Sequence, residues 1–125
     1  MLVVYIAGKY RDTRGEYWVR ENIREAEKCA QFIWQNGMVA LTPHLNTAFF
    51  GGLPGCKDGV WLEGDLELLQ RSDAVYLVSN WQNSIGAVAE VKYAQKAGIP
   101  VLYTEEEVID FKKTFLESTY EKYLH

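Results

Sequence analysis

Glu90 is the carboxylate whose setting in the sequence best suits chemistry. It follows Gly86 and Ala87 by four and three residues in the segment NSIGAVAE, residues 83–90. On an α-helix these three positions share one face, and side chains lean toward the helix N-terminus. The carboxylate would therefore overlook a hollow beside two residues with little side chain. In such a hollow it can act as nucleophile, base or electrostatic stabiliser, whereas on a solvent-facing helix it would only be solvated.

A second acid, Asp65, lies on the margin of an apolar helical stripe, where a charge is unusual. It falls three residues after Leu62 and four before Leu69. Two neighbouring acids divide the work in glycoside chemistry, because one attacks while the other protonates or positions. The alternative is a partly exposed acid that Arg71 stabilises from nearby.

Cationic and capping residues near the predicted strand ends suit the binding of an anion. Lys9 and Arg11 follow the first apolar run, and Ser84 can cap the helix that carries Glu90. The first amides of a helix present N–H groups and the positive end of its dipole. One phosphate or carboxylate would fit there. The alternative is a pair of solvated loop charges and an ordinary cap.

Several aromatic residues and a histidine are further candidates. Tyr5 lies near the carboxyl end of the first predicted strand and faces either the same crevice or the core. His44 lies in a loop, where it contacts either substrate or the protein itself. The rings of Phe49, Phe50 and Trp81 can stack on a nucleobase, since every base offers a π-face, or can pack as core or lid.

The elements that must position these residues alternate between strand and helix. The predicted strands are residues 2–7, 38–43, 74–78 and 99–103, and the predicted helices are 16–36, 60–70, a helix after Ser84 and another after Thr104. This order predicts a single α/β domain over residues 1–125, Rossmann-like or flavodoxin-like, with four to five parallel strands and helices on both faces. Loops at the carboxyl ends of the strands then share one crevice, and the Gly-rich loop 42–59 is expected to be functional.

Composition excludes several classes of protein. The chain is 48% apolar and 14% aromatic, which indicates a folded domain, while charges interrupt every apolar run and exclude a membrane span. A net charge of −4 argues against binding to polymeric nucleic acid, because its phosphates attract positively charged surfaces. Cys29 and Cys56 lack metal-ligand spacing, and no leader precedes the first strand. A cytoplasmic location is therefore expected.

Three segments resemble the nucleoside 2-deoxyribosyltransferase-like superfamily and, within it, the 2′-deoxynucleoside 5′-phosphate N-hydrolases. They are VYIAGKYRD (4–12), LEGDLELLQRSDAVYLVS (62–79) and SIGAVAEVKYAQKAGIPVLY (84–103). An uncharacterised phage and bacterial branch of the superfamily is similar too, because it shares the pattern Trp-x-x-Ser-x-Gly-Ala-x-x-Glu found from Trp81 to Glu90.

The resemblance implies hydrolysis of the N-glycosidic bond of a deoxynucleoside 5′-monophosphate, or transfer of its sugar. Glu90 would attack the anomeric carbon and form a covalent glycosyl intermediate, and Tyr5 would orient the Glu90 carboxylate. Asp65 would position the sugar or protonate the leaving base. Ser84 and Arg11 would hold the 5′-phosphate. The transferases have an aspartate in place of this serine, and the negative charge of that aspartate would repel a phosphate. The other implied substrate-binding residues are Gly8, Lys9, His44, Trp81, Gly86 and Ala87.

The chain departs from the family pattern in two places. Lys9 stands where the hydrolases have a serine, and residues 45–60 show no match, so the identity of the base stays open. Superfamily members usually form dimers, and Tyr120 and Tyr123 of the C-terminal helix are candidates for a homodimer interface. No metal or organic cofactor is expected.

Two other functions compete with catalysis. The first is a nucleotide-binding sensor or regulatory module that keeps the pocket without turnover. The second is a flavodoxin-like protein that holds a flavin phosphate. The absence of a hydroxyl-rich phosphate loop directly after the first strand disfavours the second.

Overall fold

The computed structural model describes the backbone of residues 1–124 and the side chains of all residues except Asp58 and those from 120 onward. Its sheet has four strands, which are β1 (Val3–Ala7), β2 (Val39–Leu41), β3 (Ala74–Leu77) and β4 (Val101–Leu102). Their order is β2-β1-β3-β4, and each neighbouring pair is parallel. The predicted flavodoxin-like α/β class is confirmed, with the lower of the two predicted strand numbers.

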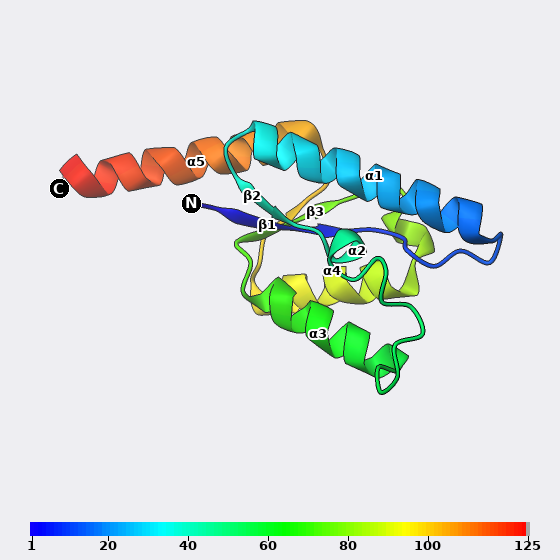
Figure 1. Cartoon of the computed structure of the whole chain (residues 1–125). Helices are drawn as coiled ribbons and strands as arrows, with labels where there is room; N and C mark the ends of the chain where they lie inside the picture. The colour runs from blue at the N-terminus through cyan, green and yellow to red at the C-terminus, as the bar shows by residue number, and fades with distance from the viewer. Residues whose placement is uncertain (125) are drawn as a thin grey trace.

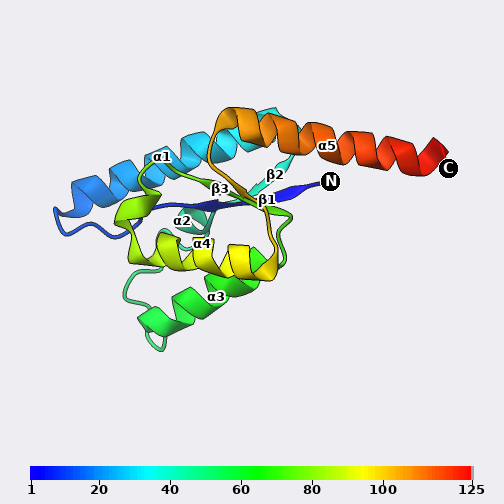
Figure 2. The same cartoon turned by 180° about the vertical axis from the view of Figure 1, so that it is seen from behind.

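Helices cover the sheet on both faces, as predicted. On one face lie α1 (Glu16–Gln35) and α5 (Glu105–Leu124), and on the other lie α3 (Asp58–Gln70) and α4 (Ile85–Ala97) (Figures 1 and 2). Successive residues of a strand point to opposite faces. Ile6 therefore packs in the cluster under α1 and α5, while Tyr5 and Ala7 pack in the cluster under α3 and α4. The Tyr5 side chain thus faces the layer that contains Glu90.

The order of the strands creates a crevice at the carboxyl edge. From the central pair β1 and β3, the chain returns through α1 to β2 on one side and through α4 to β4 on the other. The loops after β1 and β3 therefore diverge, and ligands bind at such switch points in open α/β sheets. Tyr5 pairs with Leu41 of β2 and Val75 of β3, so it lies in the middle of the sheet.

Local signals set the ends of α4, the helix of Glu90. The Ser84 hydroxyl accepts a hydrogen bond from the Ala87 N–H at 3.1 Å, which makes Ser84 the predicted N-cap. Gly98 ends the helix with φ of 75°, a left-handed conformation that favours glycine. The predicted start of this helix is confirmed.

The segment between β2 and α3 is not a loop throughout, which corrects the prediction for residues 42–59. A one-turn helix, α2 (Pro43–Asn46), follows β2 directly. Proline at the first helical position has its φ already fixed for a helix, and its missing N–H has no partner to lose there. The chain also forms a short 3₁₀-helix, η1 (Trp81–Asn83), before α4.

The C-terminal helix α5 extends well beyond the sheet in Figure 1. Its start follows the predicted capping residues, because the Thr104 hydroxyl accepts from the Glu107 N–H at 3.1 Å. The side chains of Tyr120 and Tyr123, predicted at an interface, lie outside the described residues. Within the described part of the chain, no helix combines the length and apolar character that crossing a membrane requires.

Candidate functional site

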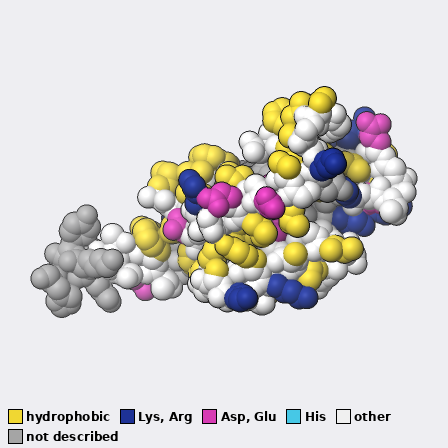
Figure 3. All heavy atoms as spheres, turned by 90° about the horizontal axis from the view of Figure 1, so that it is seen from below, with side chains coloured by type: hydrophobic (Ala, Val, Ile, Leu, Met, Phe, Trp, Pro, Cys, Tyr) yellow, Lys and Arg dark blue, Asp and Glu magenta, His cyan; other side chains and the backbone are white. Residues whose placement is uncertain are grey.

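A cavity of about 1070 Å³ opens at the carboxyl edge of the sheet. Its walls come from the end of β1 and the loop after it, residues 43–56, α3 and the start of α4. Figure 3 views the molecule from the α3 side, and hydrophobic side chains are exposed on this face. The structure brings every predicted site residue except Trp81 to the cavity, namely Tyr5, Gly8, Lys9, Arg11, His44, Asp65, Ser84, Gly86, Ala87 and Glu90.

Glu90 and Tyr5 form the buried acidic end of the cavity. Glu90 is 9% exposed and Tyr5 is fully buried. Within the described part of the chain, the Tyr5 hydroxyl and Glu90 Oε2 make no hydrogen bond that meets distance and angle limits. The two groups are nevertheless close enough to influence one another. Burial raises the pKa of Glu90 to about 7, the Tyr5 hydroxyl opposes this rise, and the negative charge of Asp65 adds to it.

The same surroundings keep Tyr5 protonated. Burial, followed by the negative charges of Glu90 and Asp65, raises the pKa of the Tyr5 phenol far above its usual range. The phenol therefore acts as a hydrogen-bond donor at any physiological pH. Asp65 lies half-buried on α3, and burial raises its pKa to about 6. Arg71, its suggested partner, instead pairs with Glu67 at 2.7 Å.

The start of α4 offers hydrogen-bond donors at the other end of the cavity. Ser84 already accepts the Ala87 N–H, and its own hydroxyl hydrogen can still donate to a ligand. The amides of Ile85 and Gly86 precede the first intrahelical hydrogen bond of α4, which runs from the Val88 N–H to the Ser84 carbonyl. Lys9 and Arg11 line the same cavity. These groups together can hold an anion.

Gly8 and Gly86 both line the cavity, but the space around their Cα atoms differs. A Cβ on Gly8 would lie 2.6 Å from the Val78 Cβ, so the chain can pass β3 here only with glycine. A Cβ on Gly86 would meet only the Ser84 hydroxyl, at 3.8 Å. The space beside Gly86 is therefore open, which agrees with the predicted hollow on the Glu90 face of α4.

His44 makes a backbone contact that was not predicted. Its Nε2 donates to the Lys9 carbonyl at 2.9 Å, and its ring packs edge-on against Tyr10 with centroids 5.6 Å apart. A carbonyl only accepts, so Nε2 carries the proton and Nδ1 is left as an acceptor. Burial lowers the pKa of this imidazole, against the opposing effect of its backbone hydrogen bonds. His44 thus supports the loop after β1 while it lines the cavity.

Two of the aromatic candidates lie away from the cavity. Trp81 in η1 packs on the apolar cluster under α4 and meets Tyr103 with ring centroids 6.1 Å apart. Phe49 is 97% exposed and does not line the cavity, whereas Phe50 does.

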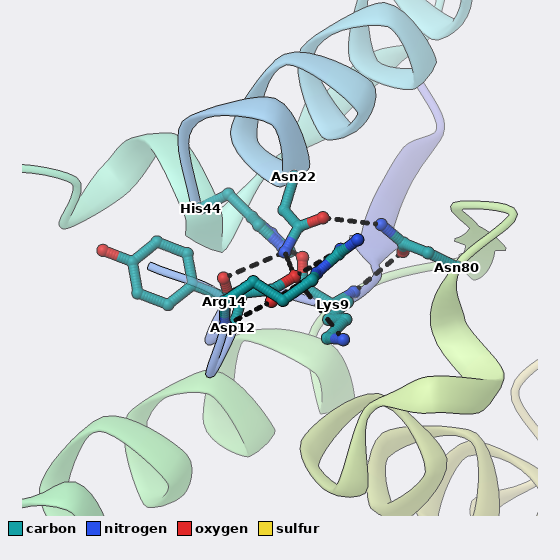
Figure 4. Close-up of polar contacts among 7 residues, drawn as sticks. Lys9, Asp12, Arg14, Asn22, His44 and Asn80 are labelled. Carbon is teal, nitrogen blue, oxygen red and sulfur yellow. Dashed lines mark hydrogen bonds and ion pairs between the residues drawn. The ribbon is translucent and has the colours of Figure 1, made fainter. Parts of the chain in front are cut away.

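Sequence reasoning missed a polar cluster beside the cavity, formed by Asp12, Asn22 and Asn80 (Figure 4). The Asp12 side chain is 1% exposed and accepts from Arg14 at 2.8 and 2.9 Å, which holds the pKa of Asp12 well below its usual range. One signal was available, because Asn22 lies four residues before Ala26 in the apolar stripe of α1. A polar residue at a buried position of a helix indicates a specific partner.

The fold and the cavity define a flavodoxin-like α/β protein with a crevice at the switch point. Residues 2–103 match the family model described as a domain of unknown function, DUF4406, and the chain belongs to this family. A comparison with curated proteins found no match.

Two solved structures share the fold. A conserved protein from Enterococcus faecalis V583 aligns with a TM-score of 0.59 and 22% identity, over 81% of this chain and 61% of that one. A 2-deoxyribosyltransferase from Bacillus psychrosaccharolyticus aligns with a TM-score of 0.57 and 20% identity, over 79% of this chain and 69% of that one. The chain thus spans less than two thirds of the Enterococcus protein. At these identities the similarity shows the fold alone.

Proposed function

We propose that the protein cleaves the N-glycosidic bond of a deoxynucleoside 5′-monophosphate, or transfers its sugar to a second base, with Glu90 as nucleophile. The observation that carries the proposal is the buried Glu90 carboxylate beside the Tyr5 phenol, on the wall of a large cavity. Both groups keep a buried oxygen without a hydrogen bond among the described residues, and a substrate can supply the missing contacts. The shared fold with a 2-deoxyribosyltransferase agrees with this chemistry.

The reaction proceeds by two displacements at the anomeric carbon. A Glu90 carboxylate oxygen forms a bond to that carbon while the bond to the base nitrogen breaks and its electron pair leaves with the base. The departing nitrogen takes a proton from Asp65, whose raised pKa of about 6 leaves a protonated fraction available. Water or the nitrogen of a second base then attacks the same carbon and releases Glu90. Two inversions give overall retention of configuration.

Tyr5 positions the nucleophile in this scheme. Its pKa is raised by burial and by the nearby carboxylates, so the phenol stays protonated and its hydroxyl favours the ionised form of Glu90. Asp65 also reaches the sugar from α3, the opposite wall of the cavity. Nucleophile, orienting donor and second acid thus come from three different elements.

The start of α4 would hold the 5′-phosphate. The Ser84 hydroxyl and the amides of Ile85 and Gly86 are donors to a phosphate oxygen, and Lys9 and Arg11 add positive charge along the cavity. A serine at the helix cap carries no charge that would repel the phosphate. We therefore expect phosphorylated substrates to be preferred over nucleosides.

Release of free base tests this function directly. The wild-type protein, Glu90→Gln and the exposed control Glu63→Gln are incubated with a panel of deoxynucleoside 5′-monophosphates and the matching nucleosides, and the bases are separated by chromatography. We expect release by the wild type and the control alone. Equal release by Glu90→Gln would contradict the assignment of the nucleophile. Binding without release would indicate a nucleotide-binding module instead of an enzyme.

A further inference from the structure

We infer that Asn80, Asn22 and His44 clamp the loop after β1, residues 8–14, and so fix the positions from which Lys9 and Arg11 reach the cavity. The inference deepens the proposed function and rests on it in one respect, because it takes these two cations as holders of the substrate phosphate. None of the three clamping residues is required to touch the reacting atoms. They are positioning residues.

The peptide groups of Lys9 are held from two sides (Figure 4). The Lys9 N–H donates to Asn80 Oδ1 at 3.0 Å, and the Lys9 carbonyl accepts from His44 Nε2 at 2.9 Å. Asn80 follows β3, and His44 lies in α2, directly after β2. The segments that follow three different strands are therefore joined at a single residue of the loop.

Asn22 of α1 ties a fourth element into the same chain of hydrogen bonds. Its Oδ1 accepts from Asn80 Nδ2 at 3.2 Å, and its Nδ2 donates to the Tyr10 carbonyl at 3.2 Å and to Asp12 Oδ2 at 3.4 Å. The orientation of both amides follows from obligatory partners, because the Lys9 N–H can only donate and the Tyr10 carbonyl can only accept. Asn22 is 6% exposed, so water cannot readily replace these bonds.

The loop is also fixed at its start and along its length. Gly8 passes so close to Val78 that no side chain would fit there. Further on, the buried Asp12 carboxylate pairs with Arg14 at 2.8 Å and with the Lys9 ammonium at 3.5 Å. The Lys9 side chain is therefore tethered as well as its backbone.

This arrangement separates binding from chemistry. Tyr5 lies within β1 and Glu90 within α4, and neither takes part in the clamp's hydrogen bonds. Loosening the clamp should weaken the hold on a phosphate and leave the chemical step at saturating substrate little changed. A role confined to global stability would instead affect the whole sheet together.

Amide hydrogen exchange and phosphate binding test the clamp together. Asn80→Ala and Asn22→Ala are compared with the wild type and with Asn46→Ala, an exposed asparagine at the end of α2. We expect exchange at residues 8–14 to rise about tenfold in the first two variants, with β3 unchanged in Asn80→Ala, and inorganic phosphate to bind about tenfold more weakly by calorimetry, as for the loss of one hydrogen bond. Base release should show a raised KM with kcat nearly unchanged.

Three results would overturn the inference. They are unchanged exchange at Lys9 in Asn80→Ala, faster exchange without weaker phosphate binding, and absence of phosphate binding to the wild type. If Asn80→Ala does not fold, Asn80→Leu serves in its place, because it keeps the bulk of the side chain and loses both the acceptor for Lys9 and the donor to Asn22. Failure of Glu90-dependent base release with the exchange and phosphate results as expected would refute the proposed function alone.

Discussion

Two polar clusters lie at the same edge of the sheet, and they differ in how completely their hydrogen bonds are satisfied. In the first, the side chains of Asp12, Asn22 and Asn80 bond to one another and to the loop backbone. In the second, the buried Tyr5 hydroxyl and Glu90 Oε2 make no hydrogen bond among the described residues. An unsatisfied buried polar group destabilises a fold by about 1–3 kcal/mol.

The contrast indicates different purposes for the two clusters. A satisfied network rigidifies the chain around it and fixes one arrangement. A carboxylate and a phenol without hydrogen-bond partners can form hydrogen bonds to a ligand, but they make the folded protein less stable. Under the proposed function, the Asp12 cluster supports the site, and the Tyr5 and Glu90 pair carries its chemistry. Substitutions in the first cluster should then lower stability most, and substitutions in the second should lower the rate of the chemical step most.

Glu90→Gln should have the largest effect on activity. The amide has nearly the same shape but cannot attack the anomeric carbon, so base release should fall by roughly a thousandfold or more. Measured rates on the best deoxynucleoside 5′-monophosphate check this. A fall of less than about tenfold would assign the chemistry to another group.

Asn22→Ala should have the largest effect on stability within the satisfied cluster. It leaves the Asp12 carboxylate and the partly buried Asn80 amide short of a partner, so the free energy of unfolding should fall by about 2 kcal/mol. Urea denaturation measures this, with the exposed Asn46→Ala expected within about 0.5 kcal/mol of the wild type. Equal stability of the two variants would remove the distinction between the clusters.

Glu90→Gln should stabilise the protein at high pH. The pKa of Glu90 is raised in the folded state from 4.5 to about 7, so its favourable contribution is complete below pH 4.5 and is lost as the pH rises through 7. Glutamine does not titrate, and the variant should be about 2 kcal/mol more stable than the wild type at pH 8 and no more stable at pH 4. Denaturation at both values is the measurement. A less stable variant at pH 8 would show that Glu90 is stabilised as an anion.

Tyr5→Phe should lower base release by about ten to a hundredfold, because the nearby hydroxyl that favours the ionised form of Glu90 is lost. Its stability should stay within about 1 kcal/mol of the wild type, since the removed hydroxyl has no hydrogen bond among the described residues. Parallel rate and urea measurements decide between this outcome and a structural role, in which stability would fall with activity.

Asp65→Asn should shift the pH profile of base release. Release by the wild type requires ionised Glu90 and protonated Asp65, so kcat/KM should be bell-shaped with its maximum between about pH 6 and 7. Asparagine cannot protonate the base and carries no charge to raise the pKa of Glu90, so the variant should be slower and should keep only the rising Glu90 limb, with its midpoint below about 7. A midpoint that stays in place would mean that the two carboxylates do not interact.

Much of this arrangement could be predicted from the sequence, because it depends on local patterns. Apolar runs and helical stripes predicted the alternating elements, and Ser84 marked the start of α4. A parallel sheet brings its carboxyl-end loops to one edge, which is why Tyr5, Asp65 and Glu90 line one cavity although they lie far apart in the chain.

The rest depends on contacts that sequence spacing does not reveal. Asn22 and Asn80 bond across 58 residues, and Asn80 and Lys9 across 71, so their partnership exists only in the folded chain. Trp81 was predicted either to stack on a base or to pack as core or lid, and spacing could not decide between these. In the folded chain its ring packs against Tyr103.

Mass spectrometry of the intact protein tests the central claim most directly. A 2′-fluoro deoxynucleoside 5′-monophosphate slows both displacements, because fluorine disfavours the oxocarbenium-like transition state, and an intermediate then accumulates. The account predicts that the wild type gains the mass of the fluorinated sugar phosphate, located on Glu90 by peptide mapping, and that Glu90→Gln gains none. An adduct on another residue, or one formed equally by Glu90→Gln, would contradict the account.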